Sequence, residues 1–190
     1  MRDLPRQRPP RLDAILADAE QAGFAMSCED RTGSLLATLA ASKPGGRLLE
    51  LGTGAGAGAA WLTAGMDAGA HLTTVETDPA VQAIARRHLA ADPRIEFVTA
   101  DADAWLTGAG GPYDFAYVDC RPGKYHRLDD LLALLAPGAL YVVDDMLPQA
   151  TWPEDHQPRV DGFLERLPEV ANFLATPMRW ASGLVVAAKV

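Results

Sequence analysis

The sequence predicts a single α/β domain built on a mostly parallel, doubly wound sheet. Short apolar segments alternate along the chain with segments of helical periodicity, which is typical of βαβ units. A glycine-rich turn, Gly52–Gly56, follows the first apolar segment, where such folds change from strand to helix. The last two apolar segments depart from the alternation, because only a short connection separates them. We therefore expect right-handed parallel crossovers and an antiparallel pair at one edge.

Length and charge limit the possible classes of protein. The 190 residues suit one domain with its own core, over residues 12–190, preceded by a flexible arm at 1–11 that is rich in arginine and proline. The net charge of -8 repels phosphate backbones, so we expect no nucleic-acid partner. No apolar run is long enough to cross a bilayer, and two cysteines suit a reducing compartment. We expect a cytoplasmic protein with no membrane partner.

The elements follow in order along the chain. Strands are expected at residues 47–51, 71–76, 95–99, 113–119, 139–143, 172–176 and 183–190. Helices are expected at residues 32–42, 59–68, 79–91, 103–106, 128–135 and 160–167, after a first helix that begins at Leu12 and ends before Gly23. Pro137-Gly138 is expected to close the helix over 128–135. Residues 147–158 form the longest irregular segment and are a candidate substrate lid or a surface loop.

The glycine-rich turn points to a nucleoside ligand. Gly52, Gly54 and Ala57 satisfy the dinucleotide-binding pattern G-x-G-x-x-A. The alternative is a glycine-rich turn between strand and helix that binds no ligand. Glu50 would repel a pyrophosphate, but it suits the amino-acid end of a zwitterionic ligand. Glu76 ends the next strand, where a carboxylate can accept hydrogen bonds from both ribose hydroxyls, as it also does in NAD sites. Glu50, together with the pair of strands at the end of the chain, therefore favours S-adenosylmethionine over a dinucleotide.

Several motifs together resemble the class I methyltransferases, and within them the catechol O-methyltransferase-like family of bacterial O-methyltransferases. The resemblance covers residues 26–190. Its motifs are Met26 with Gly33, Glu50–Gly56, Thr74–Pro79, Asp101-Ala102, Tyr113–Asp119 with Tyr125, and Pro137–Asp145. The resemblance implies a Rossmann-like sheet of seven strands in the order 3-2-1-4-5-7-6, with strand 7 antiparallel. The cofactor residues that it implies are Met26, Glu50, Gly52, Thr53, Gly54, Gly56, Gly58, Glu76, Thr77, Asp101, Ala102 and Asp119.

The same resemblance implies a reaction site in which Asp119, Asp144 and Asp145 hold a divalent cation. Three carboxylates suit Mg²⁺ or Ca²⁺, and such an ion would position and activate an acceptor hydroxyl. The family has asparagine at the third of these positions. It has a lysine, thought to be the base, at the position of Pro122, and a serine that contacts the cofactor at the position of Gly58.

The departures from the family pattern leave the base and the metal open. Lys124 and His126 lie near Pro122 in sequence and are the candidates for the base, beside Asp119 as the third catalytic residue. A mechanism with Mg²⁺ and one without a metal both stay open, as does the reading that the carboxylates cap helices or stay solvated.

The predicted function is methylation of an oxygen on a small hydroxylated or aromatic molecule, with S-adenosylmethionine as the donor. A nitrogen acceptor is the alternative within the same fold. An NAD-dependent oxidoreductase and a non-catalytic nucleotide-binding module are alternatives of other classes, although no Tyr-x-x-x-Lys pair supports the first. Relatives in this family are commonly dimers, so the resemblance predicts a homodimer.

Overall fold

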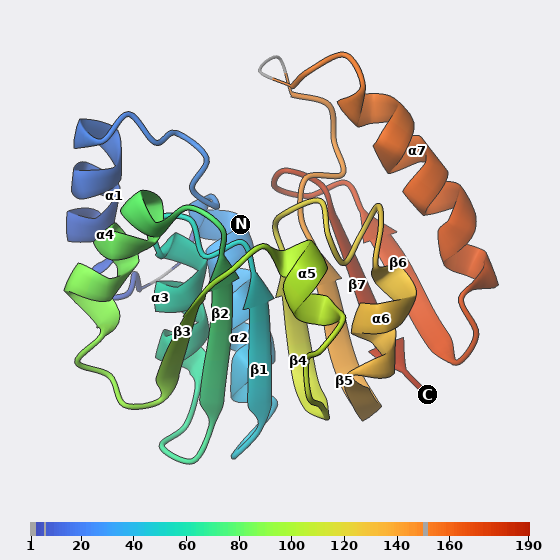
Figure 1. Cartoon of the computed structure of the whole chain (residues 1–190), viewed down its shortest axis with the longest axis horizontal. Helices are drawn as coiled ribbons and strands as arrows, with labels where there is room; N and C mark the ends of the chain where they lie inside the picture. The colour runs from blue at the N-terminus through green and yellow to red at the C-terminus, as the bar shows by residue number, and fades with distance from the viewer. Residues whose placement is uncertain (1–2, 6, 150–151) are drawn as a thin grey trace.

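The computed structural model describes residues 3–5, 7–149 and 152–190. Met1, Arg2 and Arg6 of the predicted arm, and Ala150 and Thr151 of the predicted lid, lie outside the described residues. Seven strands form one sheet: β1 (Arg47–Leu51), β2 (His71–Glu76), β3 (Ile95–Thr99), β4 (Tyr113–Val118), β5 (Leu135–Val143), β6 (Phe173–Met178) and β7 (Leu184–Lys189). Their order is β3-β2-β1-β4-β5-β7-β6, which confirms the predicted topology (Figure 1).

The pairing of the strands also agrees with the prediction. β1 is parallel to β2 and β4, β2 is parallel to β3, and β4 is parallel to β5. β7 is antiparallel to both β5 and β6, so the terminal pair completes one edge of the sheet. The order of the strands reverses between β1 and β4, which is where open α/β sheets bind ligands beyond the carboxyl ends of their strands.

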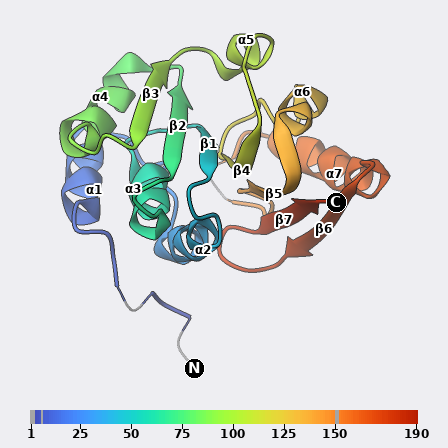
Figure 2. The same cartoon turned by 90° about the horizontal axis from the view of Figure 1, so that it is seen from below.

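Helices cover both faces of the sheet. They are α1 (Leu12–Gln21), α2 (Asp30–Ala41), α3 (Ala57–Gly65), α4 (Pro79–Leu89), α5 (Ala102–Leu106), α6 (Leu128–Ala133) and α7 (His156–Arg166), which continues into the short η1 (Leu167–Glu169). Figure 2 shows α1 to α4 on one face and α5 to α7 on the other. Alternate strand residues feed the two cores: Leu48 and Phe115 pack with α1 to α4, while Leu49 and Ala116 pack with α5 to α7.

Two element boundaries differ from the prediction for identifiable reasons. β5 begins at Leu135, not at residue 139, because Pro137-Gly138 is accommodated inside the strand. The β4–β5 register shifts there: Tyr113 pairs with Leu135, but Phe115 pairs with Leu140. α7 begins at His156, four residues before the predicted start, so the irregular segment ahead of it is shorter than expected.

Two observations bear on the surroundings of the domain. No helix among the described residues is both long and apolar enough to cross a bilayer. Within the predicted arm, Arg8 pairs with Asp13 and Asp30, and Asp3 pairs with Arg31 of α2. Ion pairs between exposed side chains are worth little, so the flexibility of the arm stays a prediction.

Candidate functional site

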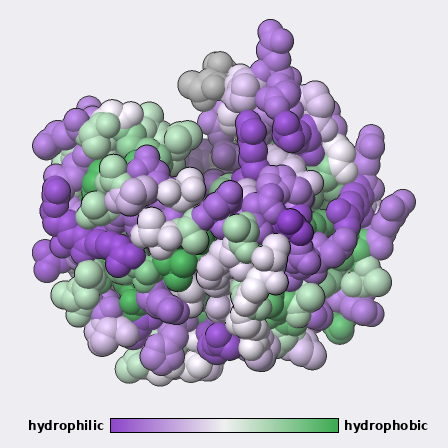
Figure 3. Space-filling view, in the orientation of Figure 1, coloured by the Kyte–Doolittle hydropathy of each residue, from purple (hydrophilic) through white to green (hydrophobic). Residues whose placement is uncertain are grey.

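A cavity of about 950 Å³ lies at the carboxyl edge of the sheet. Residues directly after β1, β2, β4 and β5 contribute to its wall, because parallel strands all end at this edge. The segment before α2 and the connection between β6 and β7 supply the other walls. Figure 3 shows the molecule hollowed between the side that carries α1 and α4 and the side that carries α7.

The glycine-rich loop is fixed in place by its neighbours. The N–H groups of Gly52 and Thr53 both donate to the Val75 carbonyl, at 2.9 and 3.1 Å. Gly52 has a φ of 97°, and a Cβ there would lie 2.7 Å from the Asp119 carbonyl oxygen. Only glycine therefore fits between the loop and the end of β4. The Gly54 N–H donates to Oε2 of the Glu76 carboxylate, at 2.8 Å, which ties the loop to the end of β2.

Glu50 is a buried carboxylate with one unused oxygen. Its side chain is 1% exposed, and its Oε2 accepts a hydrogen bond from the Thr74 hydroxyl at 2.5 Å. Its Oε1 has no hydrogen-bond partner among the described residues. Burial raises the pKa of Glu50 to about 8. A buried acceptor without a partner is costly, so this oxygen is ready to accept a hydrogen bond from a ligand.

Gly58 provides the space that Glu50 needs. A Cβ at Gly58 would lie 2.2 Å from Glu50 Oε1, well inside any normal contact. The side chain of a serine, which the family carries here, would collide with the carboxylate as it stands. Glycine at position 58 therefore leaves the Glu50 carboxylate uncovered within this recess.

The predicted nucleoside residues lie along the same cavity. The Glu76 carboxylate accepts hydrogen bonds from the Thr77 and Asp78 N–H groups, at 2.9 and 3.0 Å, which fix its position. Asp101 caps α5 by accepting from the Asp103 N–H at 2.9 Å. The predicted cofactor residues that line the cavity are Met26, Gly52, Gly54, Glu76, Thr77, Asp101, Ala102 and Asp119.

The four other predicted cofactor residues lie deeper, or away from the cavity. Glu50, Thr53 and Gly58 line a small recess beside it. The Thr53 hydroxyl lies 2.6 Å from the Thr74 hydroxyl and is part of the core. Gly56 does not line the cavity; a Cβ there would lie 2.7 Å from the Ala85 side chain. Gly56 thus serves the packing of α3 against α4.

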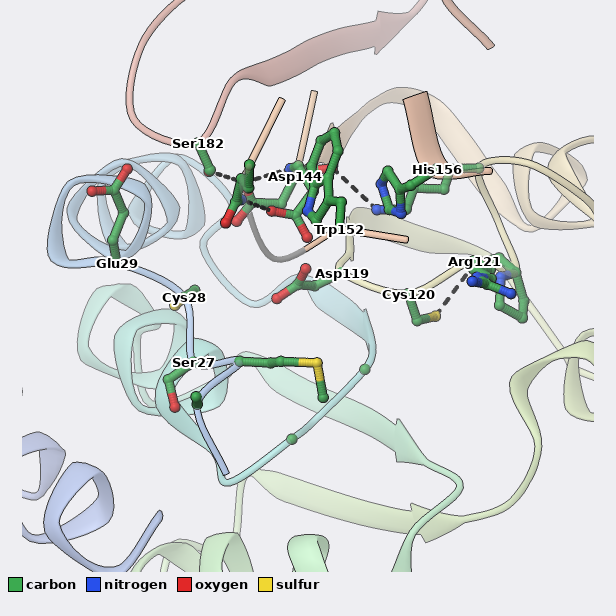
Figure 4. Close-up of a pocket in the computed structure, with 18 of the residues that line it drawn as sticks. Ser27, Cys28, Glu29, Asp119, Cys120, Arg121, Asp144, Trp152, His156 and Ser182 are labelled. Atoms are coloured by element: carbon green, nitrogen blue, oxygen red, sulfur yellow. Dashed lines mark hydrogen bonds between the residues drawn. The ribbon is translucent and has the colours of Figure 1, made fainter. Parts of the chain in front are cut away.

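The three predicted metal residues come together at the ends of β4 and β5. The side chains of Asp119 and Asp144 face the same space, and Ser182 joins Asp144 from the β6–β7 connection (Figure 4). Burial raises the pKa of all three carboxyls, and neighbouring carboxylates raise the pKa of Asp119 and Asp144 further. Such a cluster gains from a compensating positive charge.

Comparisons with known proteins give the family of this chain. Residues 49–146 match a family model described as a methyltransferase domain. A predicted O-methyltransferase of Mycobacterium sp. (strain JLS) is 30% identical over 72% of each chain. The catechol O-methyltransferase of Mycobacterium tuberculosis is 31% identical over 73% of this chain and 66% of its own length. The chain belongs to the class I S-adenosylmethionine-dependent O-methyltransferase family.

Solved structures agree with this family in fold. An O-methyltransferase from Bacillus cereus in complex with S-adenosylhomocysteine (SAH) superposes with a TM-score of 0.86 at 22% identity, over 99% of this chain and 94% of that one. The Streptomyces achromogenes O-methyltransferase TomG superposes with a TM-score of 0.84, also at 22% identity, over 97% and 91%. At this identity the likeness shows the shared fold. The chain spans 62 to 72% of the length of several curated relatives that it matches.

Lys124 and His126 are the two predicted bases, and of these Lys124 lies at the cavity. Lys124 lines the cavity and is 3% exposed, and its ammonium donates to the Asp144 carbonyl at 3.1 Å. His126 lies outside the cavity, on the surface, where its Nδ1 is 3.0 Å from an Asp103 carboxylate oxygen. Gly123, with a φ of 85°, turns the chain between Pro122 and Lys124.

Two aromatic residues at the outer end of the cavity received no individual role from the sequence. The Trp152 ring stacks on the His156 ring with centroids 3.9 Å apart, and both line the cavity. His156 Nε2 lies 3.1 Å from the Tyr125 hydroxyl. Burial lowers the pKa of His156, and the Lys124 and Arg121 charges lower it further, so the imidazole is neutral at pH 7. Both residues belong to the predicted lid segment. Because α7 begins at His156, four residues before the predicted start, this side chain lies in the wall of the cavity.

The acidic cluster does not form an open ligand set for a metal ion. The Asp144 carboxylate accepts from the Tyr117 hydroxyl at 2.8 Å, the Asp145 N–H at 2.7 Å, and the Ser182 hydroxyl. Within the described ranges, no three histidine, cysteine, aspartate or glutamate side chains are arranged to hold an ion. As arranged here, Asp119, Asp144 and Asp145 do not fit the divalent cation that the resemblance implied.

Proposed function

We propose that this protein transfers the methyl group of S-adenosylmethionine to an oxygen of a small hydroxylated or aromatic molecule. The observation that carries the proposal is the unpartnered Glu50 Oε1, buried beside the glycine-rich loop. The ligand bound at such an atom should present a positively charged donor, as the α-ammonium of S-adenosylmethionine does. The diphosphate of NAD would bring negative charge toward this carboxylate, so the geometry favours the methyltransferase over the oxidoreductase.

Each part of the cofactor has a candidate partner in the cavity. Glu50 would bind the ammonium of the methionine end, and Gly52 lets the backbone approach it closely. Glu76, held in place by three backbone N–H groups, has lone pairs left for the ribose hydroxyls. Asp101 and Ala102 would border the adenine. This assignment is supported by the solved relatives, which bind S-adenosylmethionine or SAH in the same fold.

The reaction needs an acceptor oxygen in line with the methyl group. S-adenosylmethionine supplies an electrophilic methyl group on a sulfonium sulfur. Transfer breaks the bond between carbon and sulfur, forms one between carbon and the acceptor oxygen, and releases the hydroxyl proton to water in the open cavity. Asp119 would accept a hydrogen bond from the hydroxyl, and the Lys124 ammonium would stabilise the negative charge that develops on the oxygen.

The outer end of the cavity favours a flat acceptor. Trp152 and His156 present aromatic rings there, and Arg121 adds an exposed guanidinium to the same wall. Aromatic side chains in a pocket bind planar molecules through stacking and burial of apolar area. A small phenol fits this wall better than a charged polymer does.

The proposal is tested by titrating the protein calorimetrically with SAH and, separately, with NAD. Binding of SAH with no response to NAD is expected. A response to NAD alone would support the oxidoreductase, and binding of SAH without methyl transfer to any of a panel of phenols would support a non-catalytic module. A homodimer, a cytoplasmic location and the absence of a nucleic-acid partner are proposed on sequence grounds; sedimentation equilibrium tests the first.

A further inference from the structure

Lys124 places a positive charge beside the acidic cluster, within electrostatic reach of Asp119 and Asp145. The side chain comes from the turn after β4 and is almost fully buried, with its ammonium on the Asp144 carbonyl. We infer that Lys124 is a built-in cation that takes the place of a divalent metal ion, so that this chain binds and orients its acceptor without a metal. The inference rests on the proposed function, because the acceptor oxygen is the group that the cation serves.

Both oxygens of the Asp144 carboxylate are already engaged in hydrogen bonds. Oδ1 of Asp144 accepts hydrogen bonds from the Asp145 N–H and the Ser182 hydroxyl, and Oδ2 accepts one from the Tyr117 hydroxyl. These donors come from three separate parts of the fold. A metal ion would have to displace at least one of them, which would leave a buried hydroxyl or N–H without a partner.

Asp145 is also held within the protein. Its backbone is left-handed, with a φ of 63°, and its Oδ1 accepts a hydrogen bond from the Gln149 side chain at 2.7 Å. Asp119 is the least engaged of the three carboxylates: the Tyr117 hydroxyl, which donates to Asp144, lies close enough to lower the pKa of Asp119 as well. A single, less engaged carboxylate is a poor site for an ion that takes six or more oxygen ligands.

The turn that carries Lys124 is built to point it inward. The Lys124 and Tyr125 N–H groups both donate to the Arg121 carbonyl, and the Gly123 N–H donates to the His126 carbonyl. A buried ammonium is stable only beside negative charge. Its charge lowers the pKa of Asp119 and Asp145, against the effect of burial, which places it within electrostatic reach of both.

The position of the ammonium also excludes a second cation. A divalent ion among these carboxylates would lie beside a buried positive charge that cannot move far into solvent. The ammonium has three N–H donors, and one is used by the Asp144 carbonyl. No other hydrogen bond of the ammonium is found among the described residues, so two donors are left for an acceptor oxygen in the cavity that Lys124 lines.

The single charge of Lys124 also bears on which acceptors can bind. A divalent ion can chelate two neighbouring oxygens, so it favours a vicinal diol, whereas an ammonium is a point charge that needs only one. We therefore expect an acceptor with a single reactive hydroxyl to serve as well as a catechol. A phenol and the catechol of the same skeleton form a matched pair for this comparison.

The test is a calorimetric titration of the full chain with Mn²⁺ and with Mg²⁺. The wild type is expected to bind neither, and so is Lys124→Arg, which keeps the charge. Lys124→Met removes the charge at similar volume, and its affinity for Mn²⁺ is expected to exceed that of the wild type by about tenfold or more. Lys124→Gln is a second neutral variant, which keeps a donor for the Asp144 carbonyl and is used where the methionine variant does not fold.

The outcomes separate this inference from the proposed function. Binding of Mn²⁺ or Mg²⁺ by the wild type would overturn the inference, and so would neutral variants that fold but bind the ions no better than the wild type does. SAH is titrated into each protein in parallel. If the wild type does not bind SAH, the proposed methyltransferase function is contradicted, whatever the result with the metal ions.

Discussion

Glu50 should make the stability of the unliganded protein fall as the pH rises. Its folded-state pKa is about 8 against an ordinary value of 4.5, because burial penalises the charged form. The folded state therefore holds the proton more tightly than the unfolded state does, and stability is lost between pH 4.5 and pH 8. At about 1.4 kcal/mol per pH unit, this interval corresponds to about 5 kcal/mol of unfolding free energy.

Glu50→Gln isolates this contribution, because glutamine has the same shape and does not titrate. Denaturant unfolding is measured between pH 5 and pH 8 for the wild type, for Glu50→Gln and for Glu20→Gln, an exposed control on α1. The difference between the wild type and Glu50→Gln should change by a few kcal/mol across this range, in favour of the glutamine variant at high pH. Asp119, Asp144 and Asp145 also have raised pKa values, so they also lower the stability as the pH rises. Their contribution is common to the wild type and Glu50→Gln and cancels in the difference between the two.

The ligand should reverse this penalty. An ammonium against Glu50 Oε1 stabilises the ionised carboxylate, so SAH should flatten the pH dependence of the wild type. Loss of a charged hydrogen bond costs about 1.5 to 3 kcal/mol, so Glu50→Gln should bind SAH about 10- to 150-fold more weakly. A difference in stability between wild type and variant that does not vary with pH, or equal SAH affinity, would contradict this role of Glu50.

Three further substitutions test other parts of the site. Gly58→Ala should cost about 1 to 3 kcal/mol in unfolding free energy by overpacking against Glu50, whereas Gly162→Ala, with open space around it in α7, should be neutral or stabilising; equal effects would contradict this. Tyr117→Phe removes a donor to the buried Asp144 carboxylate and should cost about 1 to 3 kcal/mol by denaturant unfolding; an unchanged stability would show that this hydrogen bond is not important. Glu76→Gln should weaken SAH binding about tenfold in calorimetry through the ribose and the loop N–H of Gly54, and unaltered affinity would remove Glu76 from the site.

Features encoded within a few neighbouring residues could be predicted from the sequence. β1, β2 and β3 have the predicted bounds, because each is an apolar segment ended by a turn. The glycine-rich loop and its acidic neighbours are equally local. Pro137-Gly138 misled the prediction of β5, since a bulge lets the strand continue through residues that usually stop one.

Features that depend on distant contacts could not be predicted in the same way. Ser182 lies 38 residues from Asp144 in sequence, and nothing around it indicates that it would donate to that carboxylate. Lys124 and His126 looked equivalent on one loop, but the turn at Gly123 buries the lysine and leaves the histidine on the surface. The unused oxygen of Glu50 likewise depends on Gly58 and Thr74, which the fold brings together.

A crystal structure of the protein with SAH tests the central claim most directly. The α-amino group should lie within hydrogen-bond distance of Glu50 Oε1, and both ribose hydroxyls should bind the Glu76 carboxylate. Electron density for the nucleoside elsewhere on the protein, or with its amino group turned away from Glu50, would contradict that claim.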